Sequence, residues 1–467
     1  MKSLFLYLLL VGLPALAVLG VLQMGQGLTG QISAEGNPLG PAEILAMPHV
    51  ARLLAQVAVV LLLSRLVGRS FRRIHQPQVM GEMVAGILLG PSLLGWLFPQ
   101  VLNALFPASS LGFLNALSQL GVVLYMFLVG LHLDPRTLRR HRHAAFVISH
   151  ASIICPFLLG ALLALYLYPR LSDGNATFTQ FALFVGTAMS ITAFPVLARI
   201  VADGNLLHTK VGMVAIACAA VDDVTAWCIL AGVVLFVRAG AVPAVIWTMV
   251  IGSAVYAVAM LLGVRRALAR LGAKFEDRGT ITHEMLAVII LLMFASGWIT
   301  ESLGIHALFG AFLMGVIMPK QPQFVAALSD KLEPITVVLF LPLFFAFTGL
   351  RTSMGLLSEP ASWFYCGLII LVAIAGKFGG SILSTRLSGM SWRESSAIGT
   401  LMNTRGLMEL VVLNIGLDVG AISHRVFTMM VFMALVTTFM AAPLLDWIYP
   451  IEARSKTVVL PAAAEVI

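Results

Sequence analysis

Runs of about 20 apolar residues recur along the whole 467-residue chain. Each run is long enough for a helix to cross the roughly 30 Å hydrocarbon core of a bilayer. Hydrophobic residues make up 60% of the chain and charged residues only 11%, whereas ordinary soluble domains have about 25% charged residues. A soluble protein of this length cannot hide that much apolar surface. The chain is therefore predicted to be an all-α, polytopic membrane protein.

The hydropathy pattern predicts fourteen helical spans, most of them separated by short polar loops. In chain order, the predicted spans are 4–23, 48–69, 78–96, 111–133, 144–168, 179–202, 212–236, 243–264, 282–303, 306–319, 335–350, 362–386, 394–417 and 424–449.

The first apolar run is either a retained helix or a signal peptide. It follows the basic residue Lys2 and has no clear small-residue cleavage site after it, which favours a retained helix. The predicted organisation is an N-terminal apolar helix or signal peptide with an outer linker over 1–47, a transmembrane domain over 48–450, and a short cytoplasmic tail over 451–467.

Basic residues are distributed unevenly between the two sides of the predicted topology. With the start of the chain placed inside, the outer side carries only Arg52, Arg170, Arg238, Arg351 and Arg425, and most of the 29 Lys and Arg residues lie in inner loops. This is the positive-inside bias of a bacterial inner-membrane protein. The bias explains the net charge of +8 without a nucleic-acid partner.

Two polar stretches inside apolar spans resemble each other. GTAMSITAFP begins at Gly186 and GTLMNTRGLM begins at Gly399, and both contain G-T-x-M followed by Ser or Asn. The first stretch enters from outside and the second from inside, so they run antiparallel. A match of this length also arises by chance, but both segments are polar where a span should be apolar. Paired interrupted spans indicate a transporter built from inverted repeats with two crossed, broken helices.

Two adjacent carboxylates, Asp222 and Asp223, lie near the middle of the span 212–236. An ionisable group inside a span costs about 2.5–3.5 kcal/mol on insertion scales, so such residues are functional candidates. Neighbouring helix positions differ by about 100° in direction. One aspartate can therefore face a partner helix while the other faces a cavity. The structural alternative is that both carboxylates cap broken helices or bind backbone groups.

A partner of opposite charge is available in Lys377, which lies inside the apolar span 362–386. A buried lysine loses its proton unless a carboxylate holds it. Pairing with the aspartate pair is the least costly solution, and Asp222 is the expected partner. In the structural alternative, Lys377 reaches toward the inner face near Arg386.

The two interrupted spans supply further oxygen atoms. In the first span, Thr187, Ser190 and Thr192 precede Pro195, whose ring breaks the helical hydrogen-bond ladder. Freed carbonyls and hydroxyls at such a break are predicted to coordinate a cation.

In the second span, Asn403, Thr404, Arg405 and Gly406 interrupt the helix and Glu409 follows one turn later. Arg405 and Glu409 are four residues apart and can pair on one helix face. Charged side chains at such a break compensate the exposed ends of the helix dipoles, so a structural role is favoured for Arg405. For Glu409 an ion-path role and a structural role stay open.

A further carboxylate, Glu82, lies in a glycine-containing span. The glycines favour close helix packing. Glu82 is either a second acidic group on the ion path or a cap on a neighbouring helix, and the cap is favoured.

Together these motifs resemble the monovalent cation/proton antiporter superfamily, in the branch of plant cation/proton exchangers, Kef-type transporters and bacterial sodium/proton antiporters. The matching stretches fall between about residues 76 and 417 and are QPQVMGEMVAGILLGPSLLG, LGVVLYMFLVGLHLD, SITAFPVLARI, AAVDDVTAW, GIHALFGAFLMGVIMP, LPLFFAFTGLRT and MNTRGLMELVVLNIG.

The resemblance implies a thirteen-helix fold with a mobile core, a dimerisation domain and hence a homodimer. The predicted N-terminal helix is then additional. It also implies that the ion-binding aspartate of the family falls on Asp223, its acidic neighbour on Asp222 and its basic residue on Lys377. The broken helices fall around Ser190 and Asn403. The Asp-Asp pattern is the one associated in this family with electrogenic sodium/proton exchange.

The predicted function is exchange of a small monovalent cation, Na+ or K+ bound at Asp223, for protons by alternating access. No enzyme motif and no cofactor is indicated, and the transported ions and membrane lipid are the expected partners. Two other classes stay open, namely a sodium-coupled carrier of an organic anion and a non-transporting membrane sensor. The Asp-Asp and Lys constellation argues against the anion carrier.

Overall fold

The computed structural model describes most of the chain between residues 49 and 450. The described residues are 17, 20, 49–74, 76–132, 142–204, 206, 209–238, 243–304 and 306–450. Apart from positions 17 and 20, the predicted span 4–23 lies outside them, as does the tail 451–467. Every regular element in the described part is a helix, and ten helices there are long and apolar enough to cross a membrane. The all-α, polytopic prediction is confirmed.

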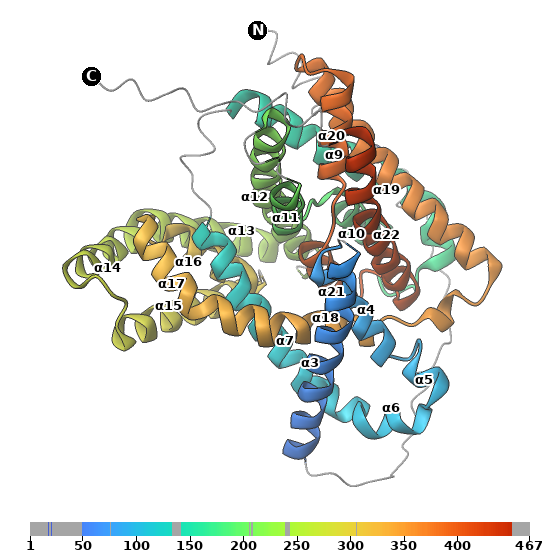
Figure 1. The fold of residues 1–467 in the computed structure, drawn as a ribbon, viewed down its shortest axis with the longest axis horizontal. Helices are drawn as coiled ribbons and strands as arrows, with labels where there is room; N and C mark the ends of the chain where they lie inside the picture. Colours follow the sequence, from blue (N-terminus) through green and yellow to red (C-terminus); the bar gives the residue numbers. More distant parts are fainter. Residues whose placement is uncertain are drawn as a thin grey trace.

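The helices follow one another with short connections (Figure 1). In chain order they are α3 His49–Arg73, α4 Gln78–Leu89, α5 Leu94–Leu97, α6 Pro99–Leu105, α7 Ala108–His132, α9 Arg142–Leu171, α10 Phe178–Ser190, α11 Phe194–Asp203, α12 Lys210–Arg238, α13 Pro243–Val258, the π-helix η3 Ala259–Val264, α14 Arg265–Arg278, α15 His283–Ser302, α16 Ala307–Ile317, α17 Pro322–Ile335, the π-helix η4 Thr336–Phe340, α18 Leu341–Leu350, the 3-10 helix η5 Met354–Leu357, α19 Pro360–Leu387, α20 Trp392–Met402, α21 Leu407–Asp418 and α22 His424–Ile448.

Two predicted spans are shorter than the helices that contain them. The span 243–264, whose last residues form η3, continues into α14, which ends at Arg278 and is followed by Gly279 in a left-handed conformation (φ +67°). The span 335–350 is the second half of a helix that begins at Pro322, where proline occupies the first helical position. In both cases the additional turns are polar, so an apolar window ends before the helix does.

The two broken helices begin with the same local motif. At α10 the Thr177 side chain accepts a hydrogen bond from the Gln180 amide while the Gln180 side chain accepts one from the Thr177 amide. At α20, Ser391 and Glu394 form the same reciprocal pair. Each motif satisfies two backbone groups that a helix start leaves without partners. Two short helices of similar length thus start with a capping box and stop at a break, which agrees with the repeat seen in the sequence.

The helices pack as two units. We call α9–α12 and α19–α22 the broken-helix unit, and α3, α4, α7 and α13–α18 the scaffold unit. Within the first, α9 packs against α10, α12 and α19; within the second, α7 packs against α16 and α18. Figure 1 shows the helices α14–α17 projecting as an arm of the scaffold unit, away from the broken-helix unit.

Glycines bring the scaffold backbones into direct contact. A Cβ atom at Gly86 of α4 would lie 2.6 Å from the Cα atom of Ala346 in α18. A Cβ atom at Gly130 of α7 would lie 2.2 Å from the carbonyl oxygen of Phe312 in α16, and one at Gly315 would approach α7 as closely. No side chain fits at these positions. Close approach through small residues is the usual way in which helices associate in lipid.

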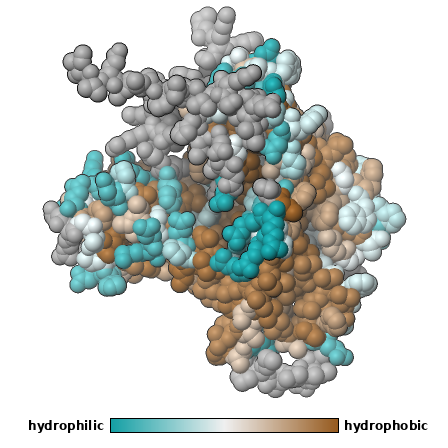
Figure 2. All heavy atoms as spheres, viewed as in Figure 1, coloured by the Kyte–Doolittle hydropathy of each residue, from teal (hydrophilic) through white to brown (hydrophobic). Residues whose placement is uncertain are grey.

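The outer surface is largely apolar. Figure 2 shows a broad hydrophobic surface over the middle and lower part of the molecule, with polar side chains gathered on the α14–α17 arm. The polar patch near the centre of that view lies over the end of α3, whose last turn carries Arg72 and Arg73. This distribution is that of a protein whose sides face lipid.

Candidate ion-binding site

The first break separates α10 from α11 at residues 191–193, which have no helical conformation. The helix stops at Ser190, and Ile191 is extended (φ −80°, ψ 138°). Pro195 follows as the second residue of α11, where its missing N–H costs no helical hydrogen bond. The break therefore leaves the last carbonyls of α10 and the first amides of α11 inside the protein.

The second break separates α20 from α21 at Asn403–Gly406. The amide of Ala193 donates a hydrogen bond of 3.0 Å to the carbonyl of Thr404, so the two breaks touch through their backbones. A Cβ atom at Gly406 would lie 2.9 Å from a methyl carbon of Val196. Glycine thus allows the second break to approach α11.

Asp222 is fully buried and is surrounded by donors. Its carboxylate lies 2.8 Å from Nζ of Lys377 and accepts hydrogen bonds from the hydroxyls of Ser149 at 2.5 Å and Thr192 at 2.6 Å. Ser152 donates to the same carboxylate at 3.2 Å. The ion pair expected between Lys377 and Asp222 is present, so Lys377 does not reach toward Arg386.

Lys377 also caps the first break. Its ammonium donates to the carbonyl of Ser190, the last residue of α10, at 2.6 Å and to the carbonyl of Ser152 at 3.0 Å. With Asp222 it thus has three acceptors for its three protons. A fully buried charge is tolerated only when it is paired and hydrogen-bonded in this way.

Arg405 holds the same helix end from the second break. One guanidinium nitrogen donates to the carbonyl of Ala188 at 2.8 Å and the other to the carbonyl of Met189 at 2.8 Å. The first nitrogen also lies 3.2 Å from a carboxylate oxygen of Glu409. Two positive side chains therefore face the negative end of the α10 dipole, and Glu409 lies in the first turn of α21, at its positive end. This geometry agrees with the structural role favoured for Arg405.

Asp223 differs from its neighbour in every contact. Its side chain is 1% exposed, yet neither carboxylate oxygen has a hydrogen-bond partner of normal geometry among the described residues. The polar group that faces it is the amide of Phe194, the first residue of α11. The start of a helix favours negative charge. Asp223 is thus a buried carboxylate without a countercharge in hydrogen-bond contact.

Two other buried acceptors at the second break also have no hydrogen-bond partner in the part of the chain that the structure describes. They are Oδ1 of Asn403 and Oε1 of Glu409, and both side chains are almost completely buried. Buried polar atoms in native structures are nearly always hydrogen-bonded, so each exception asks for an explanation such as an ion or a water molecule. Oxygen atoms of this kind are the ligands that alkali and alkaline-earth cations take in proteins.

The predicted hydroxyl ligands differ in their hydrogen bonds: one lies between the two breaks and three are bonded within their own segments. Thr192 lies between the two breaks, because its hydroxyl also lies 3.0 Å from the carbonyl of Met402 at the end of α20. The hydroxyls of Thr187, Ser190 and Thr404 instead donate to backbone carbonyls three or four residues earlier in their own segments. Their protons are occupied, and only their lone pairs remain for an ion.

Glu82 does not cap a neighbouring helix through the contact observed. Its carboxylate accepts a hydrogen bond of 2.9 Å from Gln78, one turn earlier in α4. Glu82 belongs to the scaffold unit, away from the two breaks.

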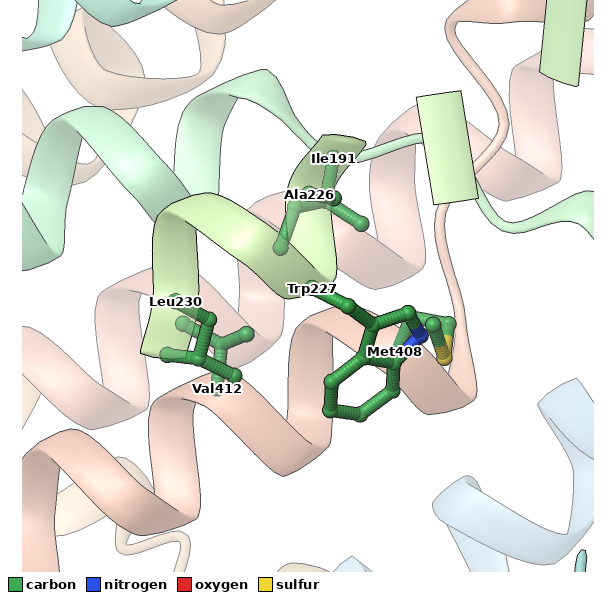
Figure 3. Close-up of a pocket in the computed structure, with 6 residues that line it drawn as sticks. All are labelled: Ile191, Ala226, Trp227, Leu230, Met408 and Val412. Carbon is green, nitrogen blue, oxygen red and sulfur yellow. The ribbon is translucent and has the colours of Figure 1, made fainter. Parts of the chain in front are cut away.

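An apolar cluster lies beside Asp223 along α12. Six side chains enclose a hollow that leaves no space for a water molecule (Figure 3). They are Ile191, Ala226, Trp227, Leu230, Met408 and Val412, and we call them the apolar seal. Trp227 follows Asp223 by one helical turn, and its indole packs edge-on against Phe309 of the scaffold helix α16, with 5.2 Å between ring centroids.

Sequence reasoning missed Ser149 and Ser152, which bind Asp222 from α9. Their spacing of three residues places both on one face of a helix, and that is the only signal the sequence offers. Serine is common in membrane helices because small residues favour close packing, so this signal is weak. The apolar seal was missed as well, because its members come from the first break, α12 and α21.

Known proteins resemble the chain over most of its length. The family model described as sodium/hydrogen exchanger, transmembrane, matches residues 58–448. The Na(+)/H(+) antiporter NhaS4 of Synechocystis is 43% identical over 407 residues, which cover 86% of this chain and 98% of that protein. Cation/H(+) antiporter 17 of Arabidopsis thaliana is 40% identical over 90% of this chain, but the match spans only 51% of the plant protein.

A solved structure resembles the fold. The sodium proton antiporter MjNhaP1 of Methanocaldococcus jannaschii superposes with a TM-score of 0.60 at 15% sequence identity, covering 88% of this chain and all of that one. At this identity the likeness concerns the arrangement of the helices alone.

Proposed function

Because the chain belongs to the sodium/hydrogen exchanger family, we propose that it exchanges a monovalent cation, Na+ or K+, for protons across a membrane, with Asp223 as the carboxylate that binds either ion. Members of this family are secondary transporters and not enzymes, and the transported ions are their substrates, so no cofactor is needed. The name of the cyanobacterial relative supports Na+ as one substrate.

One observation carries the assignment of the ion site. Asp222 and Asp223 are adjacent and both buried, but Asp222 is paired with Lys377 and accepts hydrogen bonds from three hydroxyls, whereas among the described residues Asp223 has no countercharge in contact and only the Phe194 amide facing it. A carboxylate without a countercharge is stable in a dry interior only when a proton or a cation neutralises it. A proton and a cation therefore compete for the carboxylate of Asp223. Asp222 and Lys377 hold the break in place beside it.

Oxygen atoms from both breaks complete the proposed cation shell. Asn403 supports this best, since its amide oxygen is buried and no described residue donates a hydrogen bond to it. Thr192 contributes a hydroxyl oxygen that already lies between the breaks. Thr187, Ser190 and Thr404 contribute lone pairs, and Glu409 is a second carboxylate with one oxygen unengaged. Carboxylate, amide and hydroxyl oxygens suit both Na+ and K+.

Exchange measured in everted membrane vesicles tests the proposal. A pH-sensitive dye records dissipation of an imposed proton gradient when NaCl, KCl, LiCl or choline chloride is added. We expect dissipation with at least one alkali cation and none with choline. A sodium-coupled carrier of an organic anion would respond only when its anion is present, and a membrane sensor would respond to no addition. Either of these results would contradict the proposal.

We further propose that the protein lies in a bacterial inner membrane, as a homodimer, with its tail 451–467 in the cytoplasm. The uneven distribution of basic residues supports the orientation. Large exposed apolar side chains on α3, α13 and α15, among them Leu54, Trp247 and Trp298, supply lipid-facing or partner-facing surface on the scaffold unit.

The orientation makes a prediction for cysteine labelling. Single cysteines at Asn175 and Ser358, both exposed, should react with a membrane-impermeant maleimide added to intact cells. A cysteine at Ala273, equally exposed, and one at Arg139, outside the described residues, should react only after permeabilisation. Reaction of the Arg139 position in intact cells would invert the topology.

A further inference from the structure

The scaffold and broken-helix units meet through a polar contact at the ends of two helices. Arg351, directly after α18 of the scaffold unit, donates one hydrogen bond of 3.0 Å to Asn414 and one of 2.6 Å to Asp418. Asn414 in turn donates to the hydroxyl of Thr348 in α18 at 2.9 Å. Asn414 and Asp418 belong to α21, the second half of a broken helix. Three hydrogen bonds thus tie that half-helix to the scaffold.

More groups hold the Arg351 guanidinium in place than in an ordinary surface ion pair. The Arg351 side chain is 19% exposed and its guanidinium lies within 6 Å of the ring centroids of both Phe347 and Phe427. Aromatic rings on the cation, and two acceptors that engage separate nitrogens, fix its position. The Asp418 side chain is 39% exposed, and an exposed ion pair alone contributes little; the hydrogen bond to the buried Asn414 and the two rings are what distinguish this contact.

The helix held by Arg351 also carries part of the site and part of the seal. Glu409 begins α21 and pairs with Arg405 at the break. Met408 and Val412 come from the same helix and close the apolar seal (Figure 3). In the proposed orientation α12 runs outward from Asp223, so that the seal lies between Asp223 and the outside. Arg351 lies at the same outer end.

From this geometry we infer that Arg351 is a positioning residue for exchange: it clamps α21 to α18 and holds the outer side of the ion site closed. An exchanger must expose its site to the two sides in turn. A contact made only while the outer side is closed favours that state by its own free energy. Opening toward the outside then requires Arg351 to release Asn414 and Asp418. The inference rests on the proposed function for its purpose, but not on which residues bind the ion.

Accessibility of the seal from outside tests the clamp. The four cysteines, Cys155, Cys218, Cys228 and Cys366, are replaced, and a single cysteine is placed at Leu230, which lines the seal and is 1% exposed. Labelling by an impermeant maleimide is followed in intact cells. In Arg351→Gln and in Asp418→Asn we expect the labelling rate to rise about tenfold, because loss of one charge-assisted contact shifts the closed-to-open ratio by about that factor.

Two further variants distinguish the clamp from general loosening. The charge-swapped pair Arg351→Asp with Asp418→Arg should return the labelling rate toward that of the parent. Arg170→Gln is the matched control, since it also removes an outer arginine, but the contacts of Arg170 are with the carbonyl and ring of Tyr166 in its own helix α9. Its labelling rate should equal that of the parent.

The outcomes are decisive without any measurement of transport. Size-exclusion chromatography verifies that each variant is folded, and a cysteine at Ser358 reports sidedness in the same cells. Asp418→Asn keeps the shape of its side chain and serves as the readout if Arg351→Gln does not fold. An unchanged labelling rate in the folded single variants would overturn the clamp, as would a charge-swapped pair that labels as fast as they do. Failure of exchange in the vesicle assay with the labelling pattern intact would count against the proposed function alone.

Discussion

Replacing Asp223 by asparagine is expected to abolish cation-dependent proton movement and to leave a folded, inserted protein. The carboxylate accepts no hydrogen bond of normal geometry from the described residues, so the amide loses no such contact. The substitution also removes a buried charge, and a buried charge without a countercharge lowers stability in a dry interior. An amide takes up no proton at neutral pH and supplies no negative charge to neutralise a bound cation. Activity should therefore fall to the level of empty vesicles while the melting temperature is unchanged or raised.

The measurement is exchange by purified protein in proteoliposomes, with thermal unfolding followed on the same preparation. Asp330→Asn is the matched control, because it makes the same chemical change at an exposed position of α17. It should exchange at the rate of the parent. Normal exchange by Asp223→Asn would remove the central assignment, whatever the other variants do.

Replacing Lys377 by alanine is expected to cause a large loss of stability, whereas Asp223→Asn keeps its stability. The change leaves Asp222 buried without its countercharge and leaves the carbonyl of Ser190 without the ammonium that binds it at 2.6 Å. Removing one partner of a buried ion pair costs about 3–5 kcal/mol. The melting temperature should fall clearly. Exchange should fall as well, because the first break beside Asp223 loses the side chain that holds it.

A double-mutant cycle identifies the cause. In Asp222→Asn with Lys377→Ala neither buried charge remains, so most of the lost stability should return. The readouts are the melting temperature and the rate of exchange in proteoliposomes. A double variant as unstable as Lys377→Ala would show that the lysine acts through the helix end at Ser190 and not through Asp222.

The sequence was most informative where polar residues interrupt apolar runs. Both breaks were located because Pro195 and the stretch Asn403–Gly406 conflict with a continuous membrane helix. The pairing of Lys377 with Asp222 was predictable because a lysine in an apolar span needs an anion, and the chain places few anions at that depth. These inferences need only the energetic cost of a buried polar group.

Contacts that depend on how distant helices pack were not predictable. Ser152 and Asp222 are 70 residues apart, and Arg405 reaches carbonyls more than 200 residues earlier in the chain. No local rule assigns such partners. The junctions η3 and η4 also escaped prediction, because a π-helical turn changes the hydrogen-bond pattern without a distinctive residue.

At Gly86, Gly130 and Gly315 the backbones of the scaffold helices touch, so these helices cannot move apart even slightly without losing that contact. Water does not press helices together inside lipid, so dispersion between touching atoms must do so. Dispersion weakens so steeply that a gap of about 0.5–1 Å already forfeits a quarter to a half of it. The scaffold helices are then either fully packed or separated, and a loosely packed intermediate state is unstable. Selection for another ion can alter the polar side chains around the breaks, while these three positions are fixed by geometry alone.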